Sequence, residues 1–264
     1  DRHENFRIVR RLLESATPEP GDLIVLPELF DSGFSLNTAK THDASGETLT
    51  FLQRLATELH CTVHGSRTVP GDPAAPDPES RKATNRATII GPTGQILTEY
   101  AKIHPFSFGR EPESFRGGES VHTYPWESAG HRLTVCPAVC YDLRFPELFR
   151  QGLALGADAF VLGANWPAAR QTHWRALAIA RAIENQSFVL AVNRTGSDPH
   201  LAYAGGTIAV GPKGDIIGEL TDQEAVLTVN LDPADTASWR AEFGAWRDIR
   251  LTGPNPGPPG EPPE

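Results

Sequence analysis

The first seventy residues alternate between two kinds of apolar pattern, and this alternation limits the fold more than any other feature. Residues 4–15 and 49–59 carry apolar side chains at helical spacing. Residues 23–26 (LIVL) follow a Pro-Gly-Asp turn and form the short apolar run that is typical of a buried strand. Residues 62–69 have the composition of a second strand. The order helix, strand, helix, strand favours a layered α/β domain.

The rest of the chain continues this pattern. Two turns of the form Gly-Pro-x-Gly, at 91–94 and 211–214, each join two β-rich runs and indicate two sheets of similar construction. The further strands are expected at 87–90, 95–100, 133–139, 159–162, 188–192, 207–210 and 215–220, and the further helices at 146–155, 173–185 and 233–243.

Two segments are predicted to lack regular structure. Residues 70–85 are rich in Pro and Asp and are expected to form a surface loop. Residues 252–264 are rich in Pro and Gly and are expected to form a disordered tail. Because no internal linker is visible, residues 1–251 are interpreted as one domain.

Composition excludes several classes of protein. The formal net charge of −9 disfavours a nucleic-acid binder, which needs a basic surface. No apolar stretch approaches the roughly 20 residues that a membrane-spanning helix needs. Three cysteines are too few for a disulfide framework, so we expect a reducing, cytoplasmic setting. The chain has no methionine and no secretory signal, and it opens directly in a helical pattern, so we expect that residues precede it.

Cys140 is the first candidate for chemistry. It lies in TVCPAVCYDLRFPELFR, where an apolar strand ends and a polar turn leads into a helix. The partial positive charge at a helix N-terminus lowers a thiol pKa and favours the nucleophilic thiolate. The alternative is that Cys140 is a small buried apolar residue, as most free cysteines are. Cys136 lies inside the strand and is interpreted as a core residue.

Two further residues also follow strands. Glu28 comes after the strand at 23–26, and apolar neighbours are expected to raise its pKa so that it acts as a base. Lys102 follows the strand at 95–100, and its ammonium group is suited to bind an oxyanion. The alternative for each is an ordinary solvated side chain. His60 and His64 have no matching carboxylate cluster, so no metal site is expected.

Taken together, the motifs VLPELFDSGFS, YAKIH and VCYDLRFPELFR, with the long segment GANWPAARQTHWRALAIARAIENQSFVLAVNRTGSD, resemble the nitrilase or carbon–nitrogen hydrolase superfamily. The resemblance implies that Glu28 is the general base, Lys102 the oxyanion-side cation and Cys140 the nucleophile. It also implies a second glutamate after the lysine, which Glu111 in FGREPESFRGGE matches best, with Glu113 as the alternative.

The resemblance carries expectations for the fold and the assembly. It implies a single-domain, four-layer α-β-β-α sandwich of the nitrilase type that is at least dimeric, and it implies no cofactor and no metal. Members of the superfamily usually begin with a β-strand before the helix found here at residues 4–15, so the present chain departs from the pattern at its start.

The residues after the nucleophile bear on the substrate. True nitrilases usually carry Trp-Glu where this chain has Tyr141-Asp142, which places it on the amidase side. The runs CYDLRFPELFR, ANWPAAR and ARAIENQ are similar to those of omega-amidases, which deaminate 2-oxoglutaramate and 2-oxosuccinamate. Such substrates carry a carboxylate, and Arg170 or Arg144 is a candidate to bind it.

Other residues of these motifs are candidate substrate contacts. The backbone N–H of Tyr141 is expected to bind the oxyanion, Asn165 to donate hydrogen bonds and Trp166 to form an apolar wall. The alternatives are that Trp166 belongs to the core and that Arg144 pairs with a neighbouring acidic residue, Asp142 or Glu147.

The expected function is therefore hydrolysis of a small carboxylate-bearing amide through a cysteine thioester, with release of ammonia. Hydrolysis of an N-carbamoyl amino acid is the nearest alternative. A non-catalytic small-molecule binding protein on the same fold is the alternative from another class, because fold does not fix function.

Overall fold

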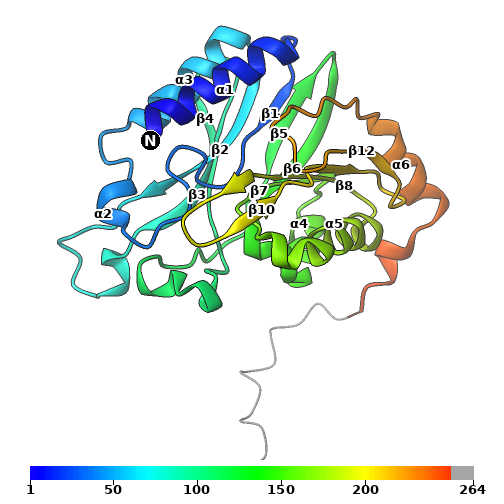
Figure 1. The fold of residues 1–264 in the computed structure, drawn as a ribbon. Helices are drawn as coiled ribbons and strands as arrows, with labels where there is room; N and C mark the ends of the chain where they lie inside the picture. The colour runs from blue at the N-terminus through cyan, green and yellow to red at the C-terminus, as the bar shows by residue number, and fades with distance from the viewer. Residues whose placement is uncertain (251–264) are drawn as a thin grey trace, which may run out of the picture.

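The structure is a computed structural model that describes residues 1–250 and contains two larger β-sheets (Figure 1). The first sheet has the strand order β1-β2-β3-β4 and the second has the order β12-β11-β8-β7-β6-β5. The strands of the first sheet are β1 (Leu23–Val25), β2 (Thr62–Val69), β3 (Thr84–Ile90) and β4 (Ile96–Ala101). Those of the second are β5 (Tyr124–Ser128), β6 (His131–Val139), β7 (Ala159–Ala164), β8 (Phe188–Asn193), β11 (Ile208–Val210) and β12 (Ile216–Glu219).

Helices form the outer layers. The apolar stripes of α1 (Arg2–Ala16) and α3 (Glu47–Leu59) place Leu13, Leu52 and Leu55 in one buried cluster with Val63 of β2. On the opposite side of the molecule, α4 (Pro146–Ala154) and α5 (Gln171–Asn185) cover the second sheet, as Figure 1 shows. A further helix, α6 (Pro233–Glu242), follows the last strand. No helix of residues 1–250 is long and apolar enough to cross a membrane.

The two sheets pack against each other between these helix layers. Contacts join β1 to β7, β3 to β6 and β4 to β5, and the side chains between them include the fully buried Tyr100, Tyr124 and Ile89. The order of layers is therefore helix, sheet, sheet, helix, and the predicted α-β-β-α sandwich is confirmed.

The two Gly-Pro-x-Gly turns form as predicted. In each, the second glycine donates a backbone hydrogen bond of 2.9 Å to the first, Gly94 to Gly91 and Gly214 to Gly211. The first turn joins β3 to β4 and the second joins β11 to β12, in both cases as antiparallel neighbours. Gly94 and Gly214 have φ values of 85° and 89°, where a side chain would be strained.

The prediction of a loop over residues 70–85 was wrong at its end, because β3 begins at Thr84. Thr84 and Asn85 pair with Val69 and Thr68 of β2, but their polar side chains hide this from an apolar pattern. The edge strand β5, the short helix α2 (Thr38–Thr41) and the hairpin of β9 (Thr195–Ser197) and β10 (Ala202–Ala204) were not predicted either. The predicted tail at 252–264 lies outside the described residues.

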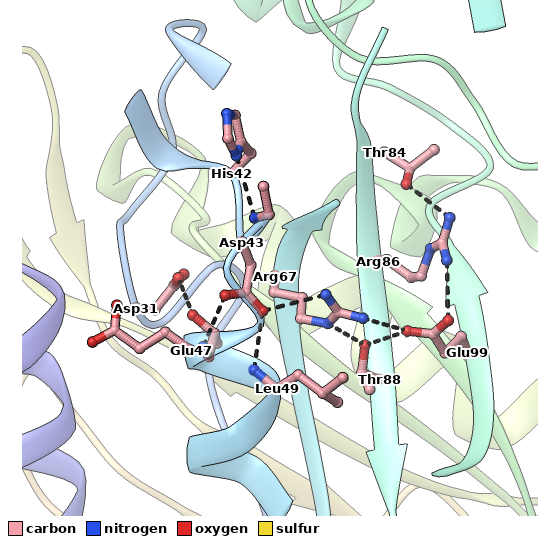
Figure 2. Close-up of polar contacts among 12 residues, drawn as sticks. Asp31, His42, Asp43, Glu47, Leu49, Arg67, Thr84, Arg86, Thr88 and Glu99 are labelled. Atoms are coloured by element: carbon pink, nitrogen blue, oxygen red, sulfur yellow. Dashed lines mark hydrogen bonds and ion pairs between the residues drawn. The ribbon is translucent and has the colours of Figure 1, made fainter. Parts of the chain in front are cut away.

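A polar network ties the helix layer to the first sheet (Figure 2). Asp43 accepts hydrogen bonds of 2.9 and 3.0 Å from the backbone N–H groups of Thr48 and Leu49 in the first turn of α3. The buried guanidinium of Arg67 lies 3.3 Å from Asp43 and 2.8 Å from Glu99 on β4. The network thus fixes the start of α3 over strands β2 to β4.

Candidate active site

Three strand ends bring Glu28, Lys102 and Cys140 together. Glu28 follows β1, Lys102 follows β4 and Cys140 follows β6. Their exposed fractions are 1%, 2% and 9%. Lys102 Nζ lies 2.9 Å from Glu28 Oε1, and the Cys140 thiol lies next to the Glu28 carboxylate. The structure therefore places the three side chains that the motifs indicate in one buried cluster.

Strained backbone and a close approach of strands hold this cluster. Cys140 has a φ of 45° at the sharp turn from β6 into the 3-10 helix η4 (Cys140–Arg144). Leu29, next to Glu28, also has a φ of 45°, and its N–H donates to Ser66 Oγ at 2.6 Å. Gly163 of β7 lies so close that a Cβ there would be 2.9 Å from the backbone nitrogen of Glu28. Only glycine allows the second sheet to approach the Glu28 segment this closely.

The structure also distinguishes between the two candidates for the auxiliary glutamate. Glu111 is fully buried, and its Oε2 accepts a hydrogen bond of 2.8 Å from Lys102 Nζ and another from the backbone N–H of Phe106. Glu113 instead pairs with Arg110 on the surface. Glu111 is therefore the glutamate that lies in the cluster.

Asn85 is a member of the cluster that the sequence interpretation missed. Its side chain is 1% exposed, and Nδ2 lies 2.7 Å from Glu28 Oε1 and 3.3 Å from Glu111 Oε1. Residues 85, 87 and 89 share the face of β3 that points to the second sheet. The sequence did contain a signal for this position. The inward-facing residues of the strand recur at every second position, and continuing that pattern from residue 87 back to residue 85 would have placed Asn85 between the sheets.

The charges of the cluster stabilise each other. Burial alone raises the pKa of Glu28, but the charge and hydrogen bond of Lys102 outweigh burial and hold this pKa below its ordinary value. The prediction that apolar neighbours raise the Glu28 pKa was wrong for this reason. Burial lowers the pKa of Lys102, but Glu111 and Glu28 raise it well above its ordinary value. The resting site thus contains a carboxylate and an ammonium group.

The thiol behaves differently from the sequence expectation. Burial, followed by the adjacent Glu28 charge, raises the pKa of Cys140 well above its ordinary value and outweighs the opposite effect of Lys102. The predicted lowering by a helix N-terminus was wrong, because η4 is only five residues long and the carboxylate is in direct contact. Cys140 is therefore a neutral thiol beside the Glu28 carboxylate, an arrangement that a nucleophile and its general base require.

Comparison with known proteins shows the family of this chain. Residues 1–241 match the family model described as carbon-nitrogen hydrolase. The chain belongs to the carbon–nitrogen hydrolase family. An omega-amidase from Escherichia coli K12 is 35% identical over 92% of this chain and 90% of its own, and a 2-oxoglutaramate amidase from Paenarthrobacter nicotinovorans is 34% identical over 87% and 78%.

A solved structure of the superfamily has the same fold. The CN-hydrolase superfamily protein from Xanthomonas campestris, whose crystal structure holds an arsenic adduct in the active site, superposes with a TM-score of 0.85 at 34% identity, and the match covers 97% of this chain and 94% of that one. With the amidase-named relatives, this makes the present chain an amidohydrolase that acts on carbon–nitrogen bonds other than peptide bonds.

In this carbon–nitrogen hydrolase, Asp142 joins the turn that carries Cys140 to the segment that carries Lys102. The carboxylate is fully buried and accepts hydrogen bonds from the Tyr100 hydroxyl at 2.7 Å and from the backbone N–H groups of Val139 and His104 at 3.0 Å. His104 Nδ1 lies 2.8 Å from the same carboxylate. Asp142 is therefore bonded to Val139, which precedes Cys140, and to Tyr100 and His104, which lie two residues before and after Lys102.

Asn165 of this hydrolase forms two hydrogen bonds with Glu28. Its backbone N–H donates to Glu28 Oε2 at 2.9 Å and its side-chain amide donates to the Glu28 carbonyl at 2.8 Å. The structure thus shows Asn165 holding Glu28. Its predicted hydrogen bond to substrate stays a prediction.

The predicted substrate-binding side chains gather around Tyr141 and Phe106, two aromatic rings in contact with each other. The Arg144 guanidinium lies over the rings of Trp166 and Tyr141, 4.7 and 6.0 Å from their centroids. The Arg170 guanidinium lies 5.5 Å from the centroid of Phe106, which contacts Tyr141 edge to face. Arg144 forms no ion pair with Asp142 or Glu147 in the described part of the chain, which is not what the alternative interpretation expected.

Trp166 is 2% exposed, and its ring nitrogen donates to the Arg170 carbonyl at 2.8 Å. It is thus a buried support beneath Arg144. Burial, and secondarily the charge of Arg170, lowers the pKa of Arg144. Two guanidinium groups therefore lie close enough to repel each other.

The imidazoles offer no metal site. His64 is buried between the sheets, with Nδ1 3.2 Å from the Tyr124 hydroxyl. Among residues 1–250, no three His, Cys, Asp or Glu side chains are grouped so that they could hold a metal ion.

Proposed function

We propose that this protein is a cysteine amidase that hydrolyses a small carboxylate-bearing amide, in the manner of an omega-amidase, through a thioester on Cys140. The observation that carries the proposal is the buried carboxylate of Glu28, which pairs with Lys102 Nζ at 2.9 Å and lies next to the Cys140 thiol. A base, a cation and a nucleophile in contact form the set that acyl transfer needs.

The first half of the reaction begins with a neutral thiol. As sulfur attacks the amide carbonyl carbon, the thiol proton moves to Glu28 and the carbonyl oxygen becomes an oxyanion. Glu28 then gives this proton to the amide nitrogen, the carbon–nitrogen bond breaks and ammonia leaves. The product that stays on the enzyme is a thioester of Cys140.

The second half regenerates the enzyme. Glu28 takes a proton from a water molecule, whose oxygen attacks the thioester carbonyl. The tetrahedral intermediate collapses, the carbon–sulfur bond breaks, and Glu28 returns the proton to the sulfur as the acid is released. Glu28 thus serves as base and acid in turn, and no cofactor takes part.

The oxyanion formed in each half needs donors. Lys102 Nζ carries three N–H bonds, two of which point to Glu28 and Glu111. The third is left for the oxyanion, together with the backbone N–H of Tyr141. Loss of one such donor typically costs about 3 kcal/mol of barrier.

The paired guanidinium groups support the choice of substrate. Besides burial, the charge of Arg170 contributes to the lowered pKa of Arg144, so an anion that binds between the two guanidinium groups would relieve their repulsion. The relatives named omega-amidase and 2-oxoglutaramate amidase point to the same class of substrate. We therefore place the substrate carboxylate between these two arginines, over Trp166.

Ammonia release from a panel of compounds tests the proposal. The panel holds 2-oxoglutaramate, glutamine, an N-carbamoyl amino acid and a simple nitrile, each with the wild-type enzyme and with Cys140→Ala. We expect turnover of 2-oxoglutaramate that is abolished in Cys140→Ala. Strong activity on the carbamoyl compound without activity on 2-oxoglutaramate would overturn the substrate assignment. Substantial turnover by Cys140→Ala would contradict the mechanism.

Substitution of the arginines tests the carboxylate site. Arg144→Gln and Arg170→Gln are each expected to lower kcat/KM for 2-oxoglutaramate about 10- to 100-fold, mostly through KM, because each removes a charge-assisted hydrogen bond worth about 1.5–3 kcal/mol. Arg175→Gln is the control, since Arg175 pairs with Glu219 on the exposed face of α5. The assignment fails if uncharged and carboxylate-bearing amides lose activity equally.

Two predictions from the sequence accompany this proposal. We expect a homo-oligomer, a dimer or larger, located in the cytoplasm. Sedimentation velocity of the purified chain measures the first, and a monomer at micromolar concentration would contradict it.

A further inference from the structure

Asn85 is a buried polar side chain whose hydrogen bonds all serve the catalytic carboxylates. Its Nδ2 lies 2.7 Å from Glu28 Oε1 and 3.3 Å from Glu111 Oε1, and Oδ1 meets no donor among the described residues. A flipped amide would turn Oδ1 toward two carboxylates, so the donor orientation is required. A buried acceptor that has no hydrogen-bond partner lowers the stability of the fold. Because the Asn85 side chain carries this cost, a contribution to stability alone does not explain its presence.

The acceptor positions of Glu28 are divided between its two oxygens. Oε1 accepts from Lys102 and Asn85, at 2.9 and 2.7 Å. Oε2 accepts from the backbone N–H of Asn165 at 2.9 Å, and the Cys140 thiol lies next to the carboxylate. Because Oε1 is held by two donors, the carboxylate cannot rotate freely, and its other oxygen stays available to the thiol.

The buried cluster also contains two acidic side chains but only one basic side chain. Glu28 and Glu111 share the single cation Lys102, and all three side chains are at most 2% exposed. Two carboxylates on one ammonium repel each other, and a neutral donor that bonds both reduces this repulsion without taking a further N–H from Lys102. The amide of Asn85 supplies one N–H to each carboxylate.

We propose that Asn85 is a positioning residue for the amidase reaction, which bridges Glu28 and Glu111 so that Glu28 faces the Cys140 thiol and Lys102 keeps one N–H for the oxyanion. This inference rests on the proposed function. It assigns Asn85 no contact with substrate, so its loss should impair kcat rather than KM.

The test compares Asn85→Ala and the isosteric Asn85→Asp with Asn185→Ala. Asn185 is the matched control, since it is also fully buried and its amide donates to a backbone carbonyl at 2.9 Å, in α5. The measurement is the pH dependence of Cys140 alkylation by iodoacetamide, followed on the Cys140 peptide by mass spectrometry. This reaction needs the Glu28 base but no amide substrate.

Loss of a donor, or addition of a charge, makes the Glu28 carboxylate easier to protonate. The acid limb of the alkylation profile should therefore move to higher pH, by about one unit or more in Asn85→Ala and further in Asn85→Asp. We also expect kcat at pH 7 to fall tenfold or more, with KM changed less than threefold. Asn185→Ala should lower Tm and leave the acid limb in place.

An unmoved acid limb in a folded Asn85→Asp protein would overturn the inference. If Asn85→Asp does not fold, the double variant Glu28→Gln with Asn85→Asp restores the net charge of the cluster, and recovery of folding supports the contact while continued failure to fold overturns it. Absence of wild-type turnover on every amide of the panel would instead sink the proposed function, and the alkylation profile would still decide the role of Asn85.

Discussion

The Tyr100 hydroxyl donates a hydrogen bond of 2.7 Å to Asp142 Oδ2, and this bond joins the strand that leads to Lys102 with the turn that carries Cys140. The same hydroxyl accepts the backbone N–H of Ile103 at 3.2 Å. Tyr100 lies on β4 of the first sheet, and Asp142 lies in η4, directly after β6 of the second sheet. Together with the bonds from His104 to Asp142, this hydrogen bond joins the segment that carries Lys102 to the turn that carries Cys140.

Tyr100→Phe should therefore affect both stability and catalysis. The substitution leaves a buried carboxylate with one donor fewer, so we expect a loss of about 1–3 kcal/mol in the free energy of unfolding. We also expect kcat to fall about tenfold, because small displacements of catalytic groups are costly. Urea unfolding and steady-state kinetics measure the two effects. Tyr124→Phe, which removes a buried hydroxyl bonded to His64, should lower stability with little change in kcat.

The two glutamates after Lys102 form a matched pair for substitution. Glu111→Gln removes a buried charge that holds Lys102 and should lower kcat/KM by about a hundredfold or more, because the ammonium loses a charge-assisted partner. Glu113→Gln breaks only an exposed pair with Arg110 and should stay within twofold of wild type. The opposite order of effects in steady-state kinetics would show that the auxiliary glutamate has been assigned incorrectly.

Gly163→Ala tests the close approach of β7 to the Glu28 segment. An added Cβ would lie 2.3 Å from the Leu26 carbonyl oxygen and 2.9 Å from the Glu28 nitrogen, so backbone must move. We expect a loss of about 1–3 kcal/mol in stability and a lower kcat, because the displaced segment carries Glu28, the proposed base. Gly244→Ala, where the nearest atom would be 3.4 Å away, is the control. Equal melting temperatures for both variants would contradict this account.

His64 makes stability depend on pH. Burial lowers its pKa from an ordinary 6.5 to about 3, so the unfolded chain takes up a proton below pH 6.5 while the folded chain does not. Stability should therefore fall as pH is lowered through this window, by about 1.4 kcal/mol per unit from this residue. The pKa of Glu28 is also lowered, but its contribution is lost only below the ordinary glutamate range, so it does not affect the upper part of the window.

Urea unfolding between pH 6.5 and 5 isolates the histidine contribution. His64→Gln keeps an acceptor for the Tyr124 hydroxyl and cannot titrate, so its stability should change less steeply with pH than that of wild type. An identical slope in the two proteins would mean that His64 is protonated in the folded state.

Much of the fold was predictable from periodicity, because a strand or helix that buries one face must repeat its apolar residues at a fixed spacing. The prediction failed where strand residues serve the site. Asn85 is polar and lies inside, so no apolar pattern marks it. The edge strand β5 alternates buried and exposed residues over only five positions, with a proline among them, which is too short a signal to recognise.

By itself, the sequence determined the order of the helices and strands other than α2, β5, β9 and β10, the two Gly-Pro-x-Gly hairpins, and the placing of Glu28, Lys102 and Cys140 at strand ends. Only the tertiary structure decided that Glu111 reaches Lys102 while Glu113 lies on the surface, and that Asn165, 137 residues from Glu28, holds its carboxylate. The tertiary structure also decided the protonation states of Glu28, Lys102 and Cys140. Local spacing cannot determine that state, because each pKa is the sum of burial and of charges that meet only when the two sheets pack together.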